Sequence, residues 1–515
     1  MSLHSRLKSN TYIDSVTLMA ISTAVNKLNG VAQAQIAMGT PMNKAVLESA
    51  GLLTEELSNA GSSDLMLALI LEDDANVNDI FLEVDSLLTR KPSQIKSNDR
   101  EVFYSLEAAA ENVPDSNFVV ISVNGAYAAR EAQKALTLGK HVMLFSDNVK
   151  IQDEKNLKDL AHDKGLLLMG PDCGTAIING VGLGFANKVR RGNIGVIGAS
   201  GTGSQEISVR VHEFGGGISQ LIGTGGRDLS TEIGARMMLD ALKMLSEDVS
   251  TEVIILVSKP PAKEIAERVL SAAANIDKPI FIWFLGYQDQ QHENAKVKLF
   301  SYSKPCAMAA VIASGVSEES IDKHALNIPL IEEVRAKLKP EQKYIRGLFC
   351  GGTLCDEAMF IASEKHSDIY SNIHPDLDHR IGPNDKSKCH TFLDFGDDAF
   401  TNGKPHPMID PSYRIERILE EGRDPEVGVL LLDFVLGFGA NSDPVGITLD
   451  ALVKVKKEAE QAGRHLEILA YVLGTDLDDP NVVSQVEKLN RAGITIASSS
   501  TNAGLLAREF VIKGA

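Results

Sequence analysis

Short, continuous apolar runs alternate with helical patterns through most of the chain, and this alternation constrains the fold more than any other feature. The runs lie at 118–125, 141–146, 165–171, 194–197, 253–258 and 279–286. A further set begins near residue 345 and continues to about 500. Strands that are apolar on both faces are typical of parallel sheets covered by helices on both sides. The sequence therefore predicts an α/β fold built from parallel sheets.

Polar or proline-containing stretches divide this pattern into segments. At 515 residues the chain is too long for one hydrophobic core, since such cores stop growing at about 250–300 residues. Linker-like stretches occur at 89–99, at 188–193 and at 332–344. We expect a small N-terminal α/β unit, with a helix from Ser15 to Leu28, followed by three parallel-sheet units. The predicted bounds are 1–98, 99–191, 192–340 and 341–515.

Composition excludes several classes of function. A formal net charge of -18 disfavours binding to nucleic acid and to anionic lipid. No run approaches the roughly 18 apolar residues that a membrane helix needs, and the N-terminus lacks the pattern of a signal peptide. The five cysteines are scattered, which indicates reduced thiols. We therefore expect a cytoplasmic protein that binds neither nucleic acid nor membrane.

The strongest candidate for a binding site is a glycine-rich loop after a buried strand. The strand Ile194–Ile197 runs into Gly198–Gly203, and a helix is expected to begin near Ser204. Ligands of open parallel sheets bind beyond the carboxyl ends of strands, where helix N-termini attract anions. The predicted anion-binding residues are Ser200, Gly201, Thr202 and Gly203. The loop matches neither a Walker loop nor G-x-G-x-x-G, and a capped tight turn is the alternative interpretation.

Three other glycine-rich loops also follow predicted strands and lead toward predicted helices. Their candidate phosphate- or acyl-binding residues are Gly225, Gly226, Arg227, Gly351, Gly352, Thr353, Gly437, Gly439, Asn441 and Ser442. Arg227 is suited to pair with a phosphate or carboxylate, and Asn441 or Ser442 is suited to cap a helix. Any one of these exits alone is more often a structural turn. Several in one chain favour a ligand with more than one anionic group.

The segment 370–411 is rich in His and Asp, which raises the question of a metal site. No two histidines have the helical i, i+4 spacing of metal ligands, and the cysteines form no C-x-x-C, so no metal is expected. A solvated loop is one interpretation and a substrate-contacting lid is the other, since prolines flank Lys404 and His406 in "GKPHPMIDP". Cys350 and Cys355 lie near a predicted helix start, either as thiolates or as buried inert thiols.

Several longer segments resemble one superfamily. "VISVNGAYAAREAQKALTLGKHVMLF" with "GLLLMGPDCGTAIING" resembles the second half of the CoA-binding Rossmann domain of the succinyl-CoA synthetase alpha subunit. "GNIGVIGASGTGSQEIS" resembles the start of its ligase domain, including Glu206. The stretch from "TFLDFGDDAF" to "VLGFGANSDP" resembles the ligase-like domain of the beta subunit. "MGTPMNKAVLESAGLL", "GGTLCDEAM" and "GKPHPMIDP" resemble FdrA proteins, which carry alpha-like and beta-like modules in one chain.

The resemblance implies Rossmann- or flavodoxin-like units and catalytic roles for Glu206, Lys404 and His406. It implies that CoA, if bound, contacts Asn124 and Pro171. No cofactor is firmly implied, and CoA and phosphate are the two candidates. The family's active histidine lies in a "GHAG" loop, whereas His292 here lacks small flanking residues, so a phosphohistidine is not expected. The N-terminal unit is also too short for an ATP-grasp domain and lacks a clear G-x-G-x-x-G.

Three functions are compatible with this resemblance. The first is phosphate-dependent acyl transfer, in which oxalurate and phosphate give oxamate and carbamoyl phosphate during allantoin degradation. The second is an ADP-forming acyl-CoA synthetase subunit, and the third is a non-catalytic regulatory protein. The resemblance implies a small anionic substrate, partner subunits and a homo-oligomer. Related alpha and beta modules face each other, so the helix start at Gly201–Gly203 is expected to face the Gly437–Ser442 loop.

Overall fold

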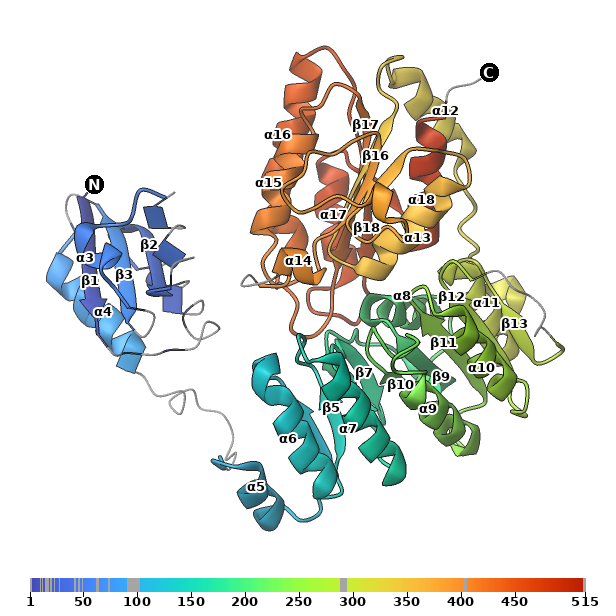
Figure 1. Cartoon of the computed structure of the whole chain (residues 1–515). Helices are drawn as coiled ribbons and strands as arrows, with labels where there is room; N and C mark the ends of the chain where they lie inside the picture. The colour runs from blue at the N-terminus through green and yellow to red at the C-terminus, as the bar shows by residue number, and fades with distance from the viewer. Residues whose placement is uncertain are drawn as a thin grey trace. The chain divides into compact units, whose positions relative to one another are not determined.

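The computed structural model divides the chain into two compact units, Met1–Phe103 and Tyr104–Ala515 (Figure 1). It describes residues 102–287, 294–401 and 405–512 without interruption. It also describes residues 2–89, except 10, 12, 14–17, 19–20, 23, 27, 41–42, 45–46, 49, 62–63 and 73–74. Among these described residues, no helix is both long and apolar enough to cross a membrane.

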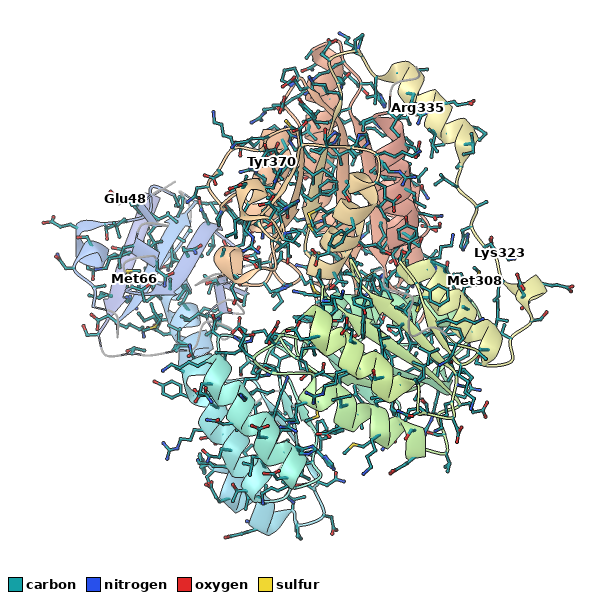
Figure 2. The ribbon with its side chains drawn as sticks, turned by 45° about the vertical axis from the view of Figure 1, so that its right-hand side comes forward. Glu48, Met66, Met308, Lys323, Arg335 and Tyr370 are labelled. Atoms are coloured by element: carbon teal, nitrogen blue, oxygen red, sulfur yellow. The ribbon has the colours of Figure 1, made fainter. Side chains whose placement is uncertain are left out.

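The first unit is an antiparallel sheet in the order β1-β3-β2. Its elements are β1 (Ser2–Lys8), β2 (Val31–Met38), α3 (Glu55–Ser58), β3 (Leu65–Leu71) and α4 (Val77–Thr89). The apolar strand β3 is central and buries Met66 completely (Figure 2). The sequence pattern does not predict β1, because "SLHSRLK" is neither continuously apolar nor strictly alternating. Much of the helix predicted over Ser15–Leu28 lies outside the described residues.

The second unit begins with a three-stranded parallel sheet in the order β4-β5-β6. Its elements are α5 (Leu106–Asn112), β4 (Phe118–Ile121), α6 (Gly125–Thr137), β5 (His141–Leu144), α7 (Ile151–Asp163) and β6 (Leu168–Met169). Alanines at helical spacing on α6, at 128, 132 and 135, pack against Val142 and Leu144 of β5 in one core. Small side chains on that face let the helix lie close to the sheet.

A seven-stranded sheet follows, in the order β13-β12-β11-β9-β10-β7-β8. Its strands are β7 (Thr175–Ile178), β8 (Val181–Gly184), β9 (Arg191–Ala199), β10 (Ile218–Gly223), β11 (Val253–Ser258), β12 (Ile280–Phe284) and β13 (Val297–Leu299). Its helices are α8 (Gly201–Glu213), α9 (Arg236–Glu247), α10 (Lys263–Ala273) and α11 (Ser303–Ala313). The hairpin β7–β8 is antiparallel, so this sheet includes residues before the expected boundary at 191.

The last sheet is six-stranded and parallel, in the order β15-β16-β14-β17-β18-β19. Its strands are β14 (Tyr344–Phe349), β15 (Ile369–Ser371), β16 (His390–Asp394), β17 (Val427–Val435), β18 (Glu467–Leu473) and β19 (Thr495–Ala497). The helices are α12 (Ile328–Lys337), α13 (Gly352–Ser363), α14 (Asp398–Thr401), α15 (Ser412–Glu421), α16 (Pro444–Gln461), α17 (Val482–Arg491) and α18 (Ser500–Phe510). Separate apolar clusters cover its two faces, as the continuous apolar strands predict.

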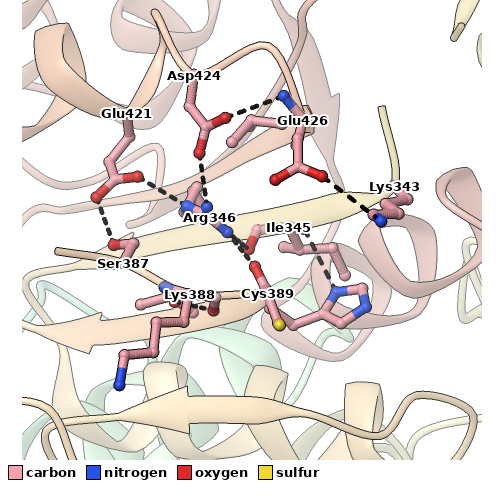
Figure 3. Close-up of polar contacts among 12 residues, drawn as sticks. Lys343, Ile345, Arg346, Ser387, Lys388, Cys389, Glu421, Asp424 and Glu426 are labelled. Atoms are coloured by element: carbon pink, nitrogen blue, oxygen red, sulfur yellow. Dashed lines mark hydrogen bonds and ion pairs between the residues drawn. The ribbon is translucent and has the colours of Figure 1, made fainter. Parts of the chain in front are cut away.

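Part of the polar segment 370–411 is fixed by a buried arginine on β14. Arg346 donates from Nε to Glu421 at 2.7 Å, from Nη2 to Asp424 at 2.9 Å and from Nη1 to the carbonyl of Cys389 (Figure 3). Glu421 also accepts from Ser387. These contacts hold residues 387–389 against α15, so this part of the segment is anchored rather than a free lid.

Candidate active site

The starts of two helices from different sheets meet in the second unit. Ser200 caps α8 by accepting a hydrogen bond from the amide of Gly203 at 3.0 Å. Its hydroxyl also shares a hydrogen bond with Thr353 in the first turn of α13. A Cβ on Gly351 would lie 3.1 Å from the methyl carbon of Thr202. We call Ser200–Gly203 together with Gly351–Thr353 the anion site, because two helix starts, where backbone N–H groups attract anions, meet there. The amides of Gly203 and Gly351 already donate to Ser200 and to Asp433.

The two glycines of the first α8 turn differ in what surrounds them. A Cβ on Gly203 would lie 2.7 Å from Ser200 Oγ and 2.9 Å from Thr353 Cγ2. A Cβ on Gly201 would lie no closer than 3.8 Å to any neighbour, the nearest atom being Thr175 Oγ1, and its φ is not in the left-handed region. Close approach therefore requires glycine at 203, and the space beside Gly201 is open to a ligand.

Beside Gly201 lies a small hollow lined mainly by glycines. It has room for about one water molecule, at about 10 Å³. Its lining includes Gly198, Gly223, Gly225 and Thr175. The Thr175 hydroxyl is buried and has no hydrogen-bond partner in the part of the chain that the structure describes. A buried hydroxyl without a partner is costly, so a ligand oxygen would be favourable here.

The loop Gly225–Arg227, which follows β10, packs against other parts of the chain rather than presenting groups to an anion. Gly225 has φ +88°, and a Cβ there would lie 2.4 Å from the carbonyl oxygen of Pro171. Arg227 donates from Nε to Glu154 at 2.9 Å and from Nη2 to the carbonyl of Val149 at 2.7 Å. The arginine expected to pair with a ligand is thus held by α7, although nearly half of its side chain stays exposed.

Four aspartates surround Lys259, which follows β11, and sequence reasoning missed this cluster. A Cβ on Gly352 would lie 2.4 Å from Asp394 Oδ2 and 3.5 Å from Lys259 Nζ. Burial opposes the charge on Lys259, but four carboxylates outweigh that effect and hold its pKa above the usual value; they belong to Asp394, Asp172, Asp356 and Asp397. Among the described residues no carboxylate lies within ion-pair distance of Nζ. The ammonium group is therefore available to a ligand.

Three of the aspartates around this lysine, Asp172, Asp356 and Asp394, hold protons more tightly than usual. Burial raises the pKa of Asp356 and of Asp394 to about 7. Asp172 remains solvent-accessible at the rim, yet the protein packed around it raises its pKa to about 6. Lys259 lowers the pKa of all three but does not offset burial. Carboxyl groups with such values exchange protons near neutral pH.

A cleft of about 460 Å³ opens beside Lys259. Its lining includes Gly226, Arg227, Ser230, Thr231, Lys259 and Pro260. Two cations thus border a space of the size that small-molecule sites occupy.

His406 lies near the same cluster, as a neutral group. A Cβ on Gly396 would lie 2.7 Å from His406 Nε2 and 3.1 Å from Asp394 Oδ1. Burial lowers the pKa of His406 to about 4, and its Nδ1 accepts from the amide of Met408 at 3.2 Å. Lys404 and His292 lie outside the described residues.

Glu206 does not lie at the α8 start. It is fully buried, accepts a hydrogen bond from the Tyr471 hydroxyl and pairs with Arg210 at 3.6 Å. Burial, followed by the nearby charge of Glu206, raises the pKa of Glu357 to about 7. These two carboxyl groups belong to a polar network between the sheets, so the predicted catalytic role for Glu206 finds no support in its position.

The Gly437–Ser442 loop packs against the loop after β8, and α8 reaches the residue before it through Gln205, whose Nε2 donates to the carbonyl of Leu436 at 3.1 Å. A Cβ on Gly437 would lie 2.2 Å from the carbonyl oxygen of Phe185, and the amide of Phe438 donates to Ala186 at 3.0 Å. A Cβ on Gly439 would lie 3.5 Å from the carbonyl oxygen of Gly184, so Gly439 also lies beside the end of β8.

The residues expected to cap a helix or to contact CoA make hydrogen bonds with nearby backbone groups. Asp443 caps α16, in place of Asn441 or Ser442. Asn441 instead donates to the carbonyl of Ile409 at 2.9 Å. Asn124 caps α6 by accepting from Ala126.

The two cysteines near α13 are inert. Cys350 and Cys355 are both buried, and burial raises the pKa of each thiol well above its usual value. The Cys350 thiol donates to the Asp433 carboxylate at 3.2 Å. Arg414 also donates to that carboxylate, at 2.9 Å. Within the described residues no cluster of His, Cys, Asp and Glu has the arrangement of a metal site.

Three family models match parts of the chain. They are "AllF, heavy metal-associated domain" at residues 1–102, "CoA binding domain" at 189–286 and "CoA-ligase" at 348–510. The CoA-binding match covers β9 to β12 of the seven-stranded sheet, whereas the sequence analysis assigns CoA-binding-like character to 99–191. A protein of Escherichia coli strain K12, the uncharacterized protein YahF, is 56% identical over 515 residues, covering 100% of this chain and 99% of YahF. The chain belongs to the YahF family.

More distant relatives connect the YahF family with CoA ligases. The succinate–CoA ligase [ADP-forming] alpha subunit of Methanothermobacter thermautotrophicus is 26% identical over 189 residues, which are 36% of this chain and 62% of that subunit. That of Aquifex aeolicus is 27% identical over 191 residues, covering 36% of this chain and 61% of the subunit. The chain thus spans less than two thirds of these two relatives. The matches support membership of the acyl-CoA synthetase and succinate–CoA ligase superfamily.

Two solved structures match this chain with low TM-scores. The ATP citrate lyase of Methanothrix soehngenii, in complex with citrate and coenzyme A, has a TM-score of 0.33 and 17% identity, covering 42% of this chain and 38% of that chain. The dinucleotide-forming acetyl-coenzyme A synthetase 1 of Ca. Korarchaeum cryptofilum, in complex with phosphate and ADP, has a TM-score of 0.32 and 16% identity, covering 82% of this chain and 87% of that one.

The heavy-metal description does not fit the residues of the first unit. Soft heavy metals prefer thiolate ligands, but the sequence has no cysteine before Cys173. The one histidine among residues 1–102 is His4, whose Nε2 lies 2.8 Å from Ser2 Oγ. The unit therefore shares the domain family without the cysteine ligands of a heavy-metal site.

Proposed function

We propose that this chain catalyses phosphate-dependent transfer of a carbamoyl group, converting oxalurate and phosphate into oxamate and carbamoyl phosphate. It would act in allantoin degradation as a homo-oligomer with partner subunits. The observation that carries the proposal is the meeting of two helix starts with Lys259 and Asp394 at Gly352. This arrangement combines an anion site with protonatable carboxyl groups.

Phosphate binding is assigned to the two helix starts. The free N–H groups of α8 and α13 together carry a substantial positive partial charge. The unpartnered Thr175 hydroxyl adds a donor beside Gly201. The Lys259 ammonium supplies a full charge near the α13 start.

The carboxyl groups suit a carbamoyl substrate because its N–H groups need acceptors. In the proposed step a phosphate oxygen bonds to the ureido carbonyl carbon of oxalurate, and the bond from that carbon to the oxamate nitrogen breaks. The leaving nitrogen takes a proton. Asp394 and Asp356, with pKa values of about 7, are suited to hand over and regain a proton at neutral pH. The cleft between Arg227 and Lys259 would hold the oxamate carboxylate.

A second candidate is an ADP-forming acyl-CoA synthetase subunit. The CoA-binding match at 189–286 favours it, as does similarity to succinate–CoA ligase alpha subunits. This function would use the same anion site but would require CoA and a partner that supplies nucleotide chemistry.

Ligand protection of the purified full chain against heat tests the two functions without needing partner subunits, because a ligand of the native state raises its melting temperature. Carbamoyl phosphate and oxamate are expected to protect the chain. Lys259→Met should lose this protection. Lys263→Met, on exposed α10, should keep it. Protection by CoA alone would favour the synthetase, and no protection by any of these ligands would favour a regulatory protein.

Turnover is tested by ³¹P NMR of carbamoyl phosphate mixed with oxamate. Loss of the carbamoyl phosphate signal with matching phosphate and oxalurate is expected in the presence of the complete complex. Phosphate release without oxalurate would contradict carbamoyl transfer.

A further inference from the structure

A second cavity, of about 480 Å³, lies away from the anion site. It is bounded by the C-terminal half of α8, by the loops that follow β18 and β19, and by α17. The carboxyl ends of parallel strands are where open α/β sheets bind ligands, and the volume falls within the range of small-metabolite pockets. Position and size together make it a candidate binding site.

One end of the cavity carries a buried arginine. Arg210 is 4% exposed, its Nη1 donates to the carbonyl of Ser498 at 2.8 Å, and the same atom pairs with Glu213. Its Nε is enclosed by protein and forms an ion pair with Glu206 at 3.6 Å, which is too long for a hydrogen bond. A ligand anion in the cavity would therefore compete with Glu213 for Arg210.

Arg190 adds a second guanidinium, which is fixed from behind. Its Nη1 donates to the carbonyls of His212 and Gly216, each at 2.8 Å. The acidic groups of the lining, Asp476 and Glu213, lie at the solvent edge, with 66% and 34% of their side chains exposed. Asp476 pairs with His212 at 2.9 Å, and Glu213 pairs with Arg210 and, at 3.0 Å, with His324. A carboxylate ligand therefore has to displace Glu213 from Arg210.

The other wall of the cavity is aliphatic. It is formed by Val209, Val472, Val482, Val486, Ile496 and Ala497. A ligand that fits both ends has one anionic head and a short hydrocarbon body. Burial of that body against the valines would add affinity in proportion to the apolar area removed from water.

We infer that this cavity binds a short aliphatic monocarboxylate. Its carboxylate lies against Arg210 and Arg190 and takes the place of Glu213, while its hydrocarbon lies against α17. The site goes beyond the proposed function and stands without it. Arg210 lies in the last turn of α8, whereas the anion site lies at the start of that helix, so the two sites are expected to bind their ligands independently.

The test is isothermal titration of the purified full chain with isovalerate, with neutral isovaleramide as the matched ligand. Saturable binding of isovalerate is expected, with the amide at least 10-fold weaker. Arg190→Met should weaken isovalerate binding at least 10-fold, and saturating inorganic phosphate should leave it unchanged. Absence of saturable isovalerate binding would overturn the inference, as would equal affinity for the amide.

A pair of variants on α17 locates the site. Val486→Trp fills the cavity and should abolish binding. Val483→Trp changes the neighbouring exposed face, at a residue that is 55% exposed and outside the lining, and should bind as the parent does. Equal binding by the two variants would show that isovalerate binds elsewhere and would refute the proposed site.

Discussion

Ser200 and Thr353 are 153 positions apart in the sequence, yet their hydroxyl groups share a hydrogen bond that joins the starts of α8 and α13. Thr353→Val removes this bond with little change in shape and should lower the free energy of unfolding by about 1 kcal/mol. Ser200→Ala also removes the cap on Gly203 and should cost about 2 kcal/mol. Urea denaturation measures both. Equal losses would show that the interhelix bond, and not the cap, carries the effect.

Two glycines in the same turn should respond differently to alanine. Gly203→Ala places a methyl group against Ser200 Oγ and Thr353 Cγ2 and should cost roughly 1–3 kcal/mol, because the packed neighbours must shift. Gly201→Ala meets no atom within 3.8 Å and should leave stability unchanged or slightly higher. Thermal unfolding of the two variants compares them directly. A larger loss in Gly201→Ala would contradict the packing described here.

The sequence predicts the sheets of the second unit well, because a strand buried on both faces is continuously apolar. The strand expected at 253–258 coincides with β11, Val253–Ser258. The sequence does not predict which helix starts meet, since that depends on how two sheets pack against each other. The sequence analysis names the Gly437–Ser442 loop as the partner of the α8 start and does not identify the contact of Ser200 with Thr353.

Lys259 and its aspartates were missed for a related reason. Each is a single polar residue near a strand end or on a helix, which forms no local pattern. Only the topology brings Asp172, Asp356 and Asp394 to one lysine. The lone signal in the sequence is "VSKPPA", where a cation directly follows a buried strand.

Arg346 and Arg423 form a matched pair of ion-paired arginines. Arg346 is 1% exposed and pairs with Glu421 and Asp424, so Arg346→Met should cost about 3 kcal/mol by removing a buried cation from both carboxylates, although Arg417 still pairs with Glu421 at 2.7 Å. Arg423 pairs with Glu458 at the surface, and Arg423→Met should cost less than about 1 kcal/mol. Urea denaturation separates the two, and equal losses would contradict the buried role of Arg346.

The pH dependence of stability tests the carboxyl cluster through Asp356. Burial raises the pKa of Asp356 to about 7, well above its value in an unfolded chain, near 4. The folded protein therefore binds this proton more tightly, so the stability that it contributes is complete below about pH 4 and is lost as the pH rises toward 7 and beyond. The variant Asp356→Asn keeps the shape of the side chain and removes its charge.

This variant should raise the free energy of unfolding at pH 8 by about 1–4 kcal/mol, since one pKa unit corresponds to about 1.4 kcal/mol, and should have little effect at pH 4. Asp378→Asn, in the exposed 3₁₀ turn Leu377–His379, is the control and should change neither value. Urea denaturation of the three proteins between pH 4 and pH 8 gives the comparison. If Asp356→Asn destabilises the protein at pH 8, the carboxylate is charged and paired with Lys259 in the native state, and it could not supply the proton that carbamoyl transfer requires.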